Sequence, residues 1–254
     1  MKTLISWNVN GIRSAERKGF LSWLASSGAD VVCVQETKVQ TDQLTEELLN
    51  PQGYTSYWHS AVKKGYSGVA VYCREKPFSA AHMGIPRFDN EGRVLVLEWK
   101  DFTLINAYFP NSQDAGARLP YKLDFCDSLL SYAKKLIKKG KNLVICGDYN
   151  IAHTAIDLAR PKENEGSAGY LPEEREWMSK FLSSGFVDTF RMFTPGPGHY
   201  SWWSYRAGAR ARNVGWRIDY HCVNEAFRSK VVAAEILPDV PGSDHCPVLV
   251  RLDV

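Results

Sequence analysis

Short apolar runs bounded by turn residues make up much of this chain. An apolar run of about four to eight residues between turn signals is typical of a buried strand. We therefore predict strands at Thr3–Trp7, Val31–Gln35, Gly68–Cys73, Val94–Trp99, Thr103–Tyr108, Leu143–Cys146, Trp216–Val223, Val231–Leu237 and Pro247–Leu252.

Other segments repeat apolar residues at helical spacing. They predict helices at about Arg17–Ser26, Thr41–Leu49, Arg118–Lys139 and Pro172–Ser184. The predicted strands are apolar along nearly their whole length, which indicates burial on both faces. The pattern therefore predicts an α/β fold in which two sheets pack on each other and helices cover their outer faces.

Composition adds bounds on size and location. The chain has 254 residues, 44% of them hydrophobic, and no linker or repeat divides it, so we expect one domain over residues 1–254. No apolar run approaches the roughly 20 residues of a membrane span, and no signal-peptide core follows Met1. We expect an intracellular monomer without a membrane partner, cytoplasmic and nucleoid-associated in a prokaryote or nuclear in a eukaryote.

The charge distribution says more than the net charge of +3, which permits binding to a polyanion without requiring it. Arginines and aromatic residues alternate in one stretch near the C-terminus. Such a mixture suits a sugar-phosphate backbone that carries an unstacked nucleotide. The stretch contains Trp202, Trp203, Tyr205, Arg206, Arg210, Arg212, Trp216 and Arg217.

Two predicted strands lead directly to a carboxylate. Val31–Gln35 is followed by Glu36, and Leu143–Cys146 leads through a glycine to Asp148. Because α/β sheets place ligands beyond the strand ends and hard divalent cations prefer oxygen ligands, these acids predict a magnesium-dependent site.

Amide side chains follow the same strands. Asn8 and Asn10 come after the first strand, Asn150 comes after Asp148, and Asn111 follows the strand that ends at Tyr108. Asparagines often only form turns. Neutral amides, however, can also ligate a metal or orient water and phosphate without adding charge that repels a phosphodiester.

A histidine near the C-terminus has two candidate carboxylate partners. Asp244 precedes His245 directly, and Asp219 lies within the predicted strand Trp216–Val223. A carboxylate bonded to one imidazole nitrogen fixes the tautomer and raises the basicity of the other nitrogen, which suits the ring to meet charge on a phosphate. Either carboxylate fits this role.

Together these segments resemble the exonuclease III family of DNA apurinic/apyrimidinic endonucleases. The matching pieces are Ser6–Gly11, Gln35–Lys38, Gly65–Ala70, Tyr108–Asn111, Cys146–Asn150, Asn213–Tyr220 and Gly242–Pro247. The resemblance implies a four-layer α/β sandwich of two packed, mainly antiparallel or mixed sheets flanked by helices. It also implies a magnesium-dependent DNA-repair phosphodiesterase that incises duplex DNA 5′ to abasic sites and leaves a 3′ hydroxyl. Trimming of 3′ ends, 3′→5′ exonuclease activity and incision beside altered bases are related activities.

The resemblance further implies roles for single residues. Glu36 would be the main ligand of Mg²⁺, for which Mn²⁺ can substitute, with help from Asn10 and from Asp244 through water. Asp148, oriented by Asn150, would activate water, and His245, paired with Asp219, would stabilise the phosphoryl oxygens. Trp202 and Trp216 would form the walls of the pocket for the abasic sugar. Contacts with phosphate or DNA would come from Asn8, Tyr108, Asn111, Lys38, Arg118, Arg206 and Asn213.

Two positions depart from the family pattern. Asn10 stands where some members carry aspartate, and Asp114 stands where some carry an arginine that reaches into DNA. Arg206 is a candidate to supply a cation in place of that arginine.

Two alternatives remain at this point. One is another phosphoesterase of the same superfamily, such as a nonspecific nuclease or an inositol phosphatase-like enzyme, and the other is a non-catalytic DNA-binding module. The aromatic and basic stretch favours a DNA substrate over the first. The presence of every acid and of His245 favours an enzyme over the second.

Overall fold

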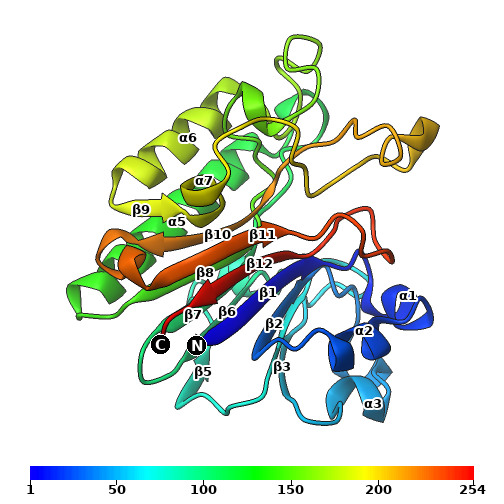
Figure 1. Cartoon of the computed structure of the whole chain (residues 1–254), viewed down its shortest axis with the longest axis vertical. Helices are drawn as coiled ribbons and strands as arrows, with labels where there is room; N and C mark the ends of the chain where they lie inside the picture. The colour runs from blue at the N-terminus through cyan, green and yellow to red at the C-terminus, as the bar shows by residue number, and fades with distance from the viewer.

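Two six-stranded sheets form the centre of the protein, and the computed structural model describes residues 1–254 (Figure 1). The first sheet has the order β11-β12-β1-β2-β4-β3 and the second β5-β6-β7-β8-β10-β9. The strands of the first sheet are β1 (Lys2–Asn8), β2 (Val31–Gln35), β3 (Thr55–His59), β4 (Val69–Cys73), β11 (Val231–Ile236) and β12 (Val248–Leu252). Those of the second are β5 (Ser79–Ala81), β6 (Val94–Glu98), β7 (Thr103–Tyr108), β8 (Leu143–Asp148), β9 (Phe186–Asp188) and β10 (Asp219–Asn224).

Both sheets are mixed. Most neighbouring strands are antiparallel, whereas β1 pairs with β2 and β7 pairs with β8 in parallel. A parallel pair sends the carboxyl ends of both strands to one edge of the sheet. Glu36, directly after β2, therefore lies on the same side as the end of β1, and Asp148 on the same side as the end of β7.

Helices cover the outer faces of the two sheets. The helices are α1 (Ile12–Arg17), α2 (Phe20–Ser26), α3 (Glu46–Leu49), α4 (Pro86–Asp89), α5 (Leu119–Lys138), α6 (Pro172–Ser183) and α7 (Thr189–Phe193). Short 3₁₀ turns occur at Thr41–Gln43, Asp114–Gly116, Ala155–Asp157, Arg206–Gly208 and Glu225–Lys230. Figure 1 shows α1 to α3 outside the first sheet and α5 and α6 outside the second.

Three apolar layers hold these four layers of secondary structure together. One cluster, with Phe20 and Leu24 of α2, packs on the first sheet, and another, with Phe125 of α5 and Phe181 of α6, packs on the second. A third cluster fills the space between the sheets, where Val71 and Val144 are fully buried. The predicted four-layer α/β sandwich is confirmed. No helix is both long enough and apolar enough to cross a membrane.

The predicted strands all occur, and their ends differ by more than one residue from the prediction at two places. β8 continues to Asp148, and β10 begins only at Asp219 because Trp216 instead makes isolated bridges to Leu158 and Trp202. The sequence did not predict β3, β5 and β9. All three lie at sheet edges, and β5 and β9 have only three residues each, so none shows a continuous apolar run.

Two of the predicted helices were wrong in their extent. Arg17–Ser26 is divided at Gly19, whose φ of 96° separates α1 from α2, and α1 itself was not predicted. Thr41–Leu49 is also divided, because Thr45 adopts an extended backbone and caps α3 with its side chain. The helices α5 and α6 agree with their predicted ranges to within a residue at each end.

Gly147 allows the close approach of β7 and β8 just before Asp148. Its φ is 138°, and a Cβ atom built there would lie 1.8 Å from the carbonyl oxygen of Ala107. No side chain fits at that distance. The glycine therefore sets the path by which β8 delivers Asp148 to the sheet edge.

We predict that Gly147→Ala costs about 4 kcal/mol or more of unfolding free energy, because the methyl group forces β7 and β8 apart. Gly140→Ala is the matched control, since Gly140 has a φ of 77° but nothing within 4 Å of its Cβ position. That control should lose only about 1 kcal/mol, the cost of a left-handed backbone without crowding. Urea unfolding of both variants measures the difference, and equal losses would contradict the close-approach argument.

Candidate active site

The strand ends of both sheets enclose a cavity of about 230 Å³. Asn8 Nδ2 of the first sheet donates to Asp148 Oδ2 of the second at 2.9 Å, so the two sheets meet at this edge. β10 runs antiparallel to β8 and starts where β8 ends, with Asp219 opposite Asp148. The cavity is lined by Asn8, Glu36, Tyr108, Asn111, Asp148, Asn150, Ala168, Gly169, Trp202, Trp216, Ile218, Asp244 and His245.

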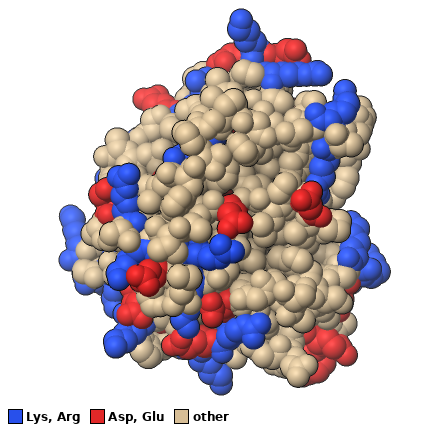
Figure 2. Space-filling model, viewed as in Figure 1, with Lys and Arg blue, Asp and Glu red and all other residues tan.

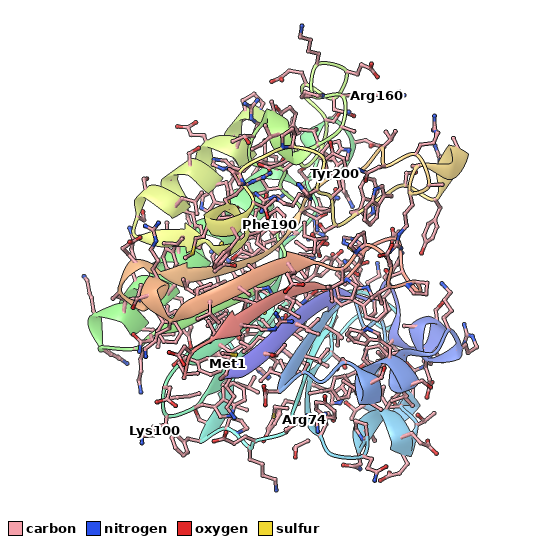
Figure 3. All side chains as sticks on the ribbon, viewed as in Figure 1. Met1, Arg74, Lys100, Arg160, Phe190 and Tyr200 are labelled. Carbon is pink, nitrogen blue, oxygen red and sulfur yellow. The ribbon has the colours of Figure 1, made fainter.

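The loops that bear the site project at one side of the sheets. Tyr200, two residues before the pocket residue Trp202, lies across the sheets from Met1 and Lys100 (Figure 3). Figure 2 shows lysine and arginine side chains at the right-hand and upper border of the molecule, where these loops lie in Figure 1, and also at the left-hand and lower border, with acidic side chains among them. The basic side chains in this view are therefore spread around the molecule and are not concentrated at the site.

Asp148 is buried and held by amides. Asn150 donates its backbone N–H to Oδ1 at 2.8 Å and its side-chain amide to Oδ2 at 3.2 Å, in addition to the bond from Asn8. Burial raises the pKa of Asp148 to about 7, with the Asp219 charge adding to the rise while His245 and the amide donors oppose it. A carboxylate with a pKa near neutrality is suited to act as a general base.

His245 is bonded to Asp219 rather than to Asp244. Its Nδ1 lies 2.9 Å from Asp219 Oδ2, and its Nε2 lies 3.9 Å from Asp148 Oδ2. Burial alone would lower the pKa of His245, but Asp219, with Asp148 and Asp244 nearby, raises it to about 10. The imidazole is therefore positively charged at neutral pH and can stabilise negative charge on a phosphoryl oxygen.

Asp244 makes no hydrogen bond to the imidazole and is held by other residues. Its Oδ1 accepts from Asn10 Nδ2 at 2.9 Å, and its Oδ2 accepts from the indole N–H of Trp202 at 3.1 Å. The residue therefore connects the loop after β1 to the aromatic wall of the pocket. Of the two carboxylates that the sequence allowed as partners of His245, the structure places Asp219 in contact with it.

Glu36 lies on the other side of the cavity among oxygen and ammonium groups. Tyr108 donates its phenol to Glu36 Oε1 at 2.5 Å, and Lys38 Nζ lies 3.5 Å from Glu36 Oε2. The same ammonium donates to Asn10 Oδ1 at 2.5 Å. Burial, followed by the charges of Glu36 and Asp148, raises the pKa of Tyr108 well above its ordinary value, so its phenol remains a donor.

Several of these residues adopt a left-handed backbone that non-glycine residues rarely occupy. The φ values are 48° at Asn10, 54° at Glu36, 52° at Lys38 and 52° at Asn150. The loop after β1 is tied to the loop after β2, because Gly11 N–H donates to the carbonyl of Glu36 at 2.7 Å. Concentration of such backbone strain at one edge is typical of a functional site.

Aromatic residues wall the pocket. The rings of Trp202 and Trp216 lie 6.2 Å apart at 88°, and Trp216 also contacts Tyr170 edge-on. Gly169 completes this wall, since a Cβ there would lie 3.1 Å from the carbonyl of Asn150 and 3.4 Å from the Trp216 ring. A side chain at position 169 would therefore crowd the wall of the pocket.

The structure does not bring every predicted contact residue to the pocket. Arg118 instead donates to the Tyr66 hydroxyl and to Glu91, and Asn213 bridges Trp203 and the Gly198 carbonyl, lining a separate groove. Arg206 is exposed in a 3₁₀ turn outside the pocket lining. Asn111, in contrast, lines the cavity and donates to Asn150 Oδ1 at 3.0 Å.

Sequence reasoning missed residues that support the site. Ala168, Gly169 and Ile218 line the cavity, and Ser201 Oγ donates to Asp219 Oδ2 at 2.6 Å. The only signal for the first two was the small-residue run before Tyr170. Nothing in the local sequence distinguishes Ser201 from an ordinary loop serine.

Comparison with known proteins identifies the family. A model of the endonuclease/exonuclease/phosphatase family matches residues 5–245, which include every residue of the cavity. The chain belongs to this family. The identification made from the sequence motifs is confirmed.

Similar proteins cover the chain along its whole length. It is 47% identical to an exodeoxyribonuclease of Bacillus subtilis (strain 168) over 254 residues, 99% of each chain. It is 39% identical to the DNA repair nuclease APEX1 of Danio rerio over 255 residues, which is 99% of this chain and 82% of that one. The structure of an AP endonuclease from Archaeoglobus fulgidus superposes with a TM-score of 0.90 at 28% identity and covers 100% of both chains.

We predict that Asp219→Asn lowers the pKa of both His245 and Asp148. Loss of the Asp219 charge makes the imidazolium less stable, so His245 gives up its proton at a lower pH. It also removes repulsion from the Asp148 carboxylate, which then ionises at a lower pH. Each pKa should fall by about one unit, which leaves His245 protonated over the pH range in which Asp148 ionises.

NMR titration of the His245 imidazole and the Asp148 carboxyl carbon measures both shifts. Asp101→Asn is the control, because Asp101 is exposed and lies outside the cavity. A change in His245 alone would show that Asp219 does not act on Asp148.

Proposed function

We propose that this protein is a magnesium-dependent nuclease that incises duplex DNA on the 5′ side of abasic sites, leaves a 3′ hydroxyl and also trims blocked 3′ ends. That it is a DNA-repair phosphodiesterase follows from its family and from the relatives described above. The observation that carries the proposal is the charged His245 between two buried carboxylates, in a small pocket that also contains Glu36.

The shape of the pocket supports an abasic nucleotide as substrate. The rings of Trp202 and Trp216 are nearly perpendicular to each other. They line a cavity of about 230 Å³ whose other lining residues are mostly polar. A sugar without a base needs little space, and an unpaired abasic nucleotide leaves the duplex at low cost. The similar structure from Archaeoglobus fulgidus is that of an AP endonuclease, which agrees with this substrate.

The groups around Glu36 fit a hard divalent cation. Glu36 and Asn10 present a carboxylate and an amide oxygen, and the ammonium of Lys38 already lies near both, so the two oxygens attract positive charge. Oxygen-only ligands favour Mg²⁺ or Mn²⁺ over softer metals. We propose Glu36 as the main ligand, with Asn10 beside it and Asp244 acting through water.

Asp148, Asp219 and His245 form a second group whose ligand atoms lie within 4.8 Å of one another and which could also hold an ion. In that group Asp219 is already bonded to the imidazole, and the charged His245 repels a cation. The Glu36 side therefore fits the metal better. Bound there, a divalent ion would supply positive charge to the phosphoryl oxygens.

The remaining steps use the side chains of the pocket. Asp148, aligned by Asn8 and Asn150, takes a proton from the attacking water as the water oxygen bonds to phosphorus. The bond between phosphorus and the 3′ oxygen breaks, and that oxygen takes up a proton from solvent to become the 3′ hydroxyl. His245 donates toward the phosphoryl oxygens, and its charge is maintained by Asp219. Tyr108 and Asn111 hold the phosphate from the opposite wall. Asn8 and His245 come from opposite ends of the sequence and line the same cavity, which supports the proposal of one catalytic domain over residues 1–254. We propose that this domain works as a monomer.

We predict that the protein with Mg²⁺ cuts a duplex bearing an abasic analogue much faster than the same duplex undamaged, and that excess EDTA abolishes cutting. Duplexes with a recessed 3′ end, a 3′ phosphate or a single uracil rank the further activities in the same assay. Equal cutting of damaged and undamaged DNA would instead indicate a nonspecific nuclease, and hydrolysis of inositol phosphates alone would exclude a DNA enzyme.

We predict different defects for Glu36→Gln and Asp148→Asn. Glu36→Gln should need more Mg²⁺ and recover activity when Mg²⁺ is raised, because it loses metal affinity. Asp148→Asn should lose on the order of 10²-fold or more in kcat at any Mg²⁺ concentration, since it lacks the base, yet still bind the abasic duplex. Mg²⁺ titrations with a gel-shift assay separate the two, and equal rescue of both variants would refute the division of roles.

A further inference from the structure

A lysine and a glutamate that no step above uses are completely buried behind the active site. Lys122 lies on α5 and Glu174 on α6, the helices that lie side by side over the second sheet (Figure 1), and both side chains have an exposed fraction of 0%. Lys122 Nζ lies 2.6 Å from Glu174 Oε1. Charged residues are rarely buried to this degree unless they are paired.

Stability alone does not account for such a pair. Removal of two charges from water is costly, and apolar residues of similar volume are often as stabilising or more so. The surroundings of Lys122 are otherwise apolar, since Phe125 and Cys126 on the same helix belong to the core. A reason for the pair therefore has to come from what its polar atoms contact.

The other side-chain hydrogen bonds of the pair go to Asn150, to Ser112 and to Leu171, which is also the N-cap of α6. Lys122 Nζ donates to the backbone carbonyl of Asn150 at 2.6 Å. Glu174 Oε1 accepts from Ser112 Oγ at 2.8 Å, and Glu174 Oε2 accepts from Leu171 N–H at 3.0 Å. Ser112 follows the pocket residue Asn111, and Leu171 comes two residues after the pocket residue Gly169.

Of these contacts, the one with Asn150 bears most directly on the catalytic carboxylate Asp148. Its backbone is left-handed, with a φ of 52°, and it holds both oxygens of Asp148 through its backbone and side-chain amides. The Lys122 ammonium anchors the carbonyl of this same residue. An unfavourable backbone conformation persists only where its surroundings over-determine it.

We propose that the Lys122–Glu174 pair is a positioning element of the active site, which fixes the backbone of Asn150 and thereby the direction of the Asp148 carboxylate. Through Ser112 and Leu171 the same pair fixes the two loops on either side of the pocket. This inference rests on the proposed role of Asp148, but the pair touches neither the substrate nor the metal site. It predicts a loss of turnover with little change in substrate binding.

The test compares Lys122→Met with two other variants of α5. Lys122→Met should lower kcat on the abasic duplex about 10-fold or more, because small displacements of a catalytic group are costly, while KM changes less than about 2-fold. It should also speed hydrogen exchange of the Asn150 amide. Lys122→Arg keeps donors for both partners and should recover most of kcat. Leu130→Ala, a core truncation on the same helix, should lower the Tm but leave kcat and Asn150 exchange unchanged.

If Lys122→Met does not fold, Ser112→Ala takes its place, because it removes a single hydrogen bond to Glu174. It should lower kcat and speed hydrogen exchange of the Asn150 amide, both by less than Lys122→Met. The inference is overturned if Leu130→Ala loses as much kcat as Lys122→Met, or if Lys122→Met or Ser112→Ala leaves both kcat and Asn150 exchange unchanged. The exchange measurement does not depend on the substrate. If the unaltered protein failed to cut abasic DNA, hydrogen exchange of the Asn150 amide would still show whether the Lys122–Glu174 pair fixes the backbone of Asn150.

Discussion

The antiparallel pairing of β8 and β10 places two buried carboxylates, Asp148 and Asp219, directly opposite each other. Two like charges at such a position in a protein interior repel strongly and cannot both remain ionised without compensation. His245 lies against both and supplies the positive charge, and the amides of Asn8 and Asn150 supply donors. The rest of the site is arranged around this requirement, since β1 provides Asn8 and the loop before β12 provides His245.

This arrangement explains which parts of the site the sequence predicts. Glu36 and Asp148 can be predicted as site residues because each lies at the end of an apolar strand that the hydrophobic pattern already defines. The carboxylate partner of His245 cannot be predicted from the sequence in this way. Asp244 is its neighbour in sequence, but Asp219 becomes its neighbour only when β10 pairs with β8.

Contacts that depend on tertiary placement were harder to predict. Asn213 lies in a motif that resembles the family, yet its amide is used to hold the loop at Trp203 and Gly198. Lys122 falls in a helical segment with many lysines and has no local mark that distinguishes it from a solvated residue. Edge strands such as β5, with three exposed residues, escape prediction because they lack an apolar face. For Lys122 the deciding contacts, with Asn150 and Glu174, are with residues distant in sequence, which the local pattern does not show.

Trp202 links the wall of the pocket to the loop of His245, because its indole N–H is bonded to Asp244. One side chain therefore both forms the pocket wall and holds the loop that carries His245. A phenylalanine at this position would keep an aromatic wall but leave Asp244 with one donor fewer. A change of the wall at Trp202 therefore also alters the surroundings of Asp244 and, through Asp244, those of Asn10.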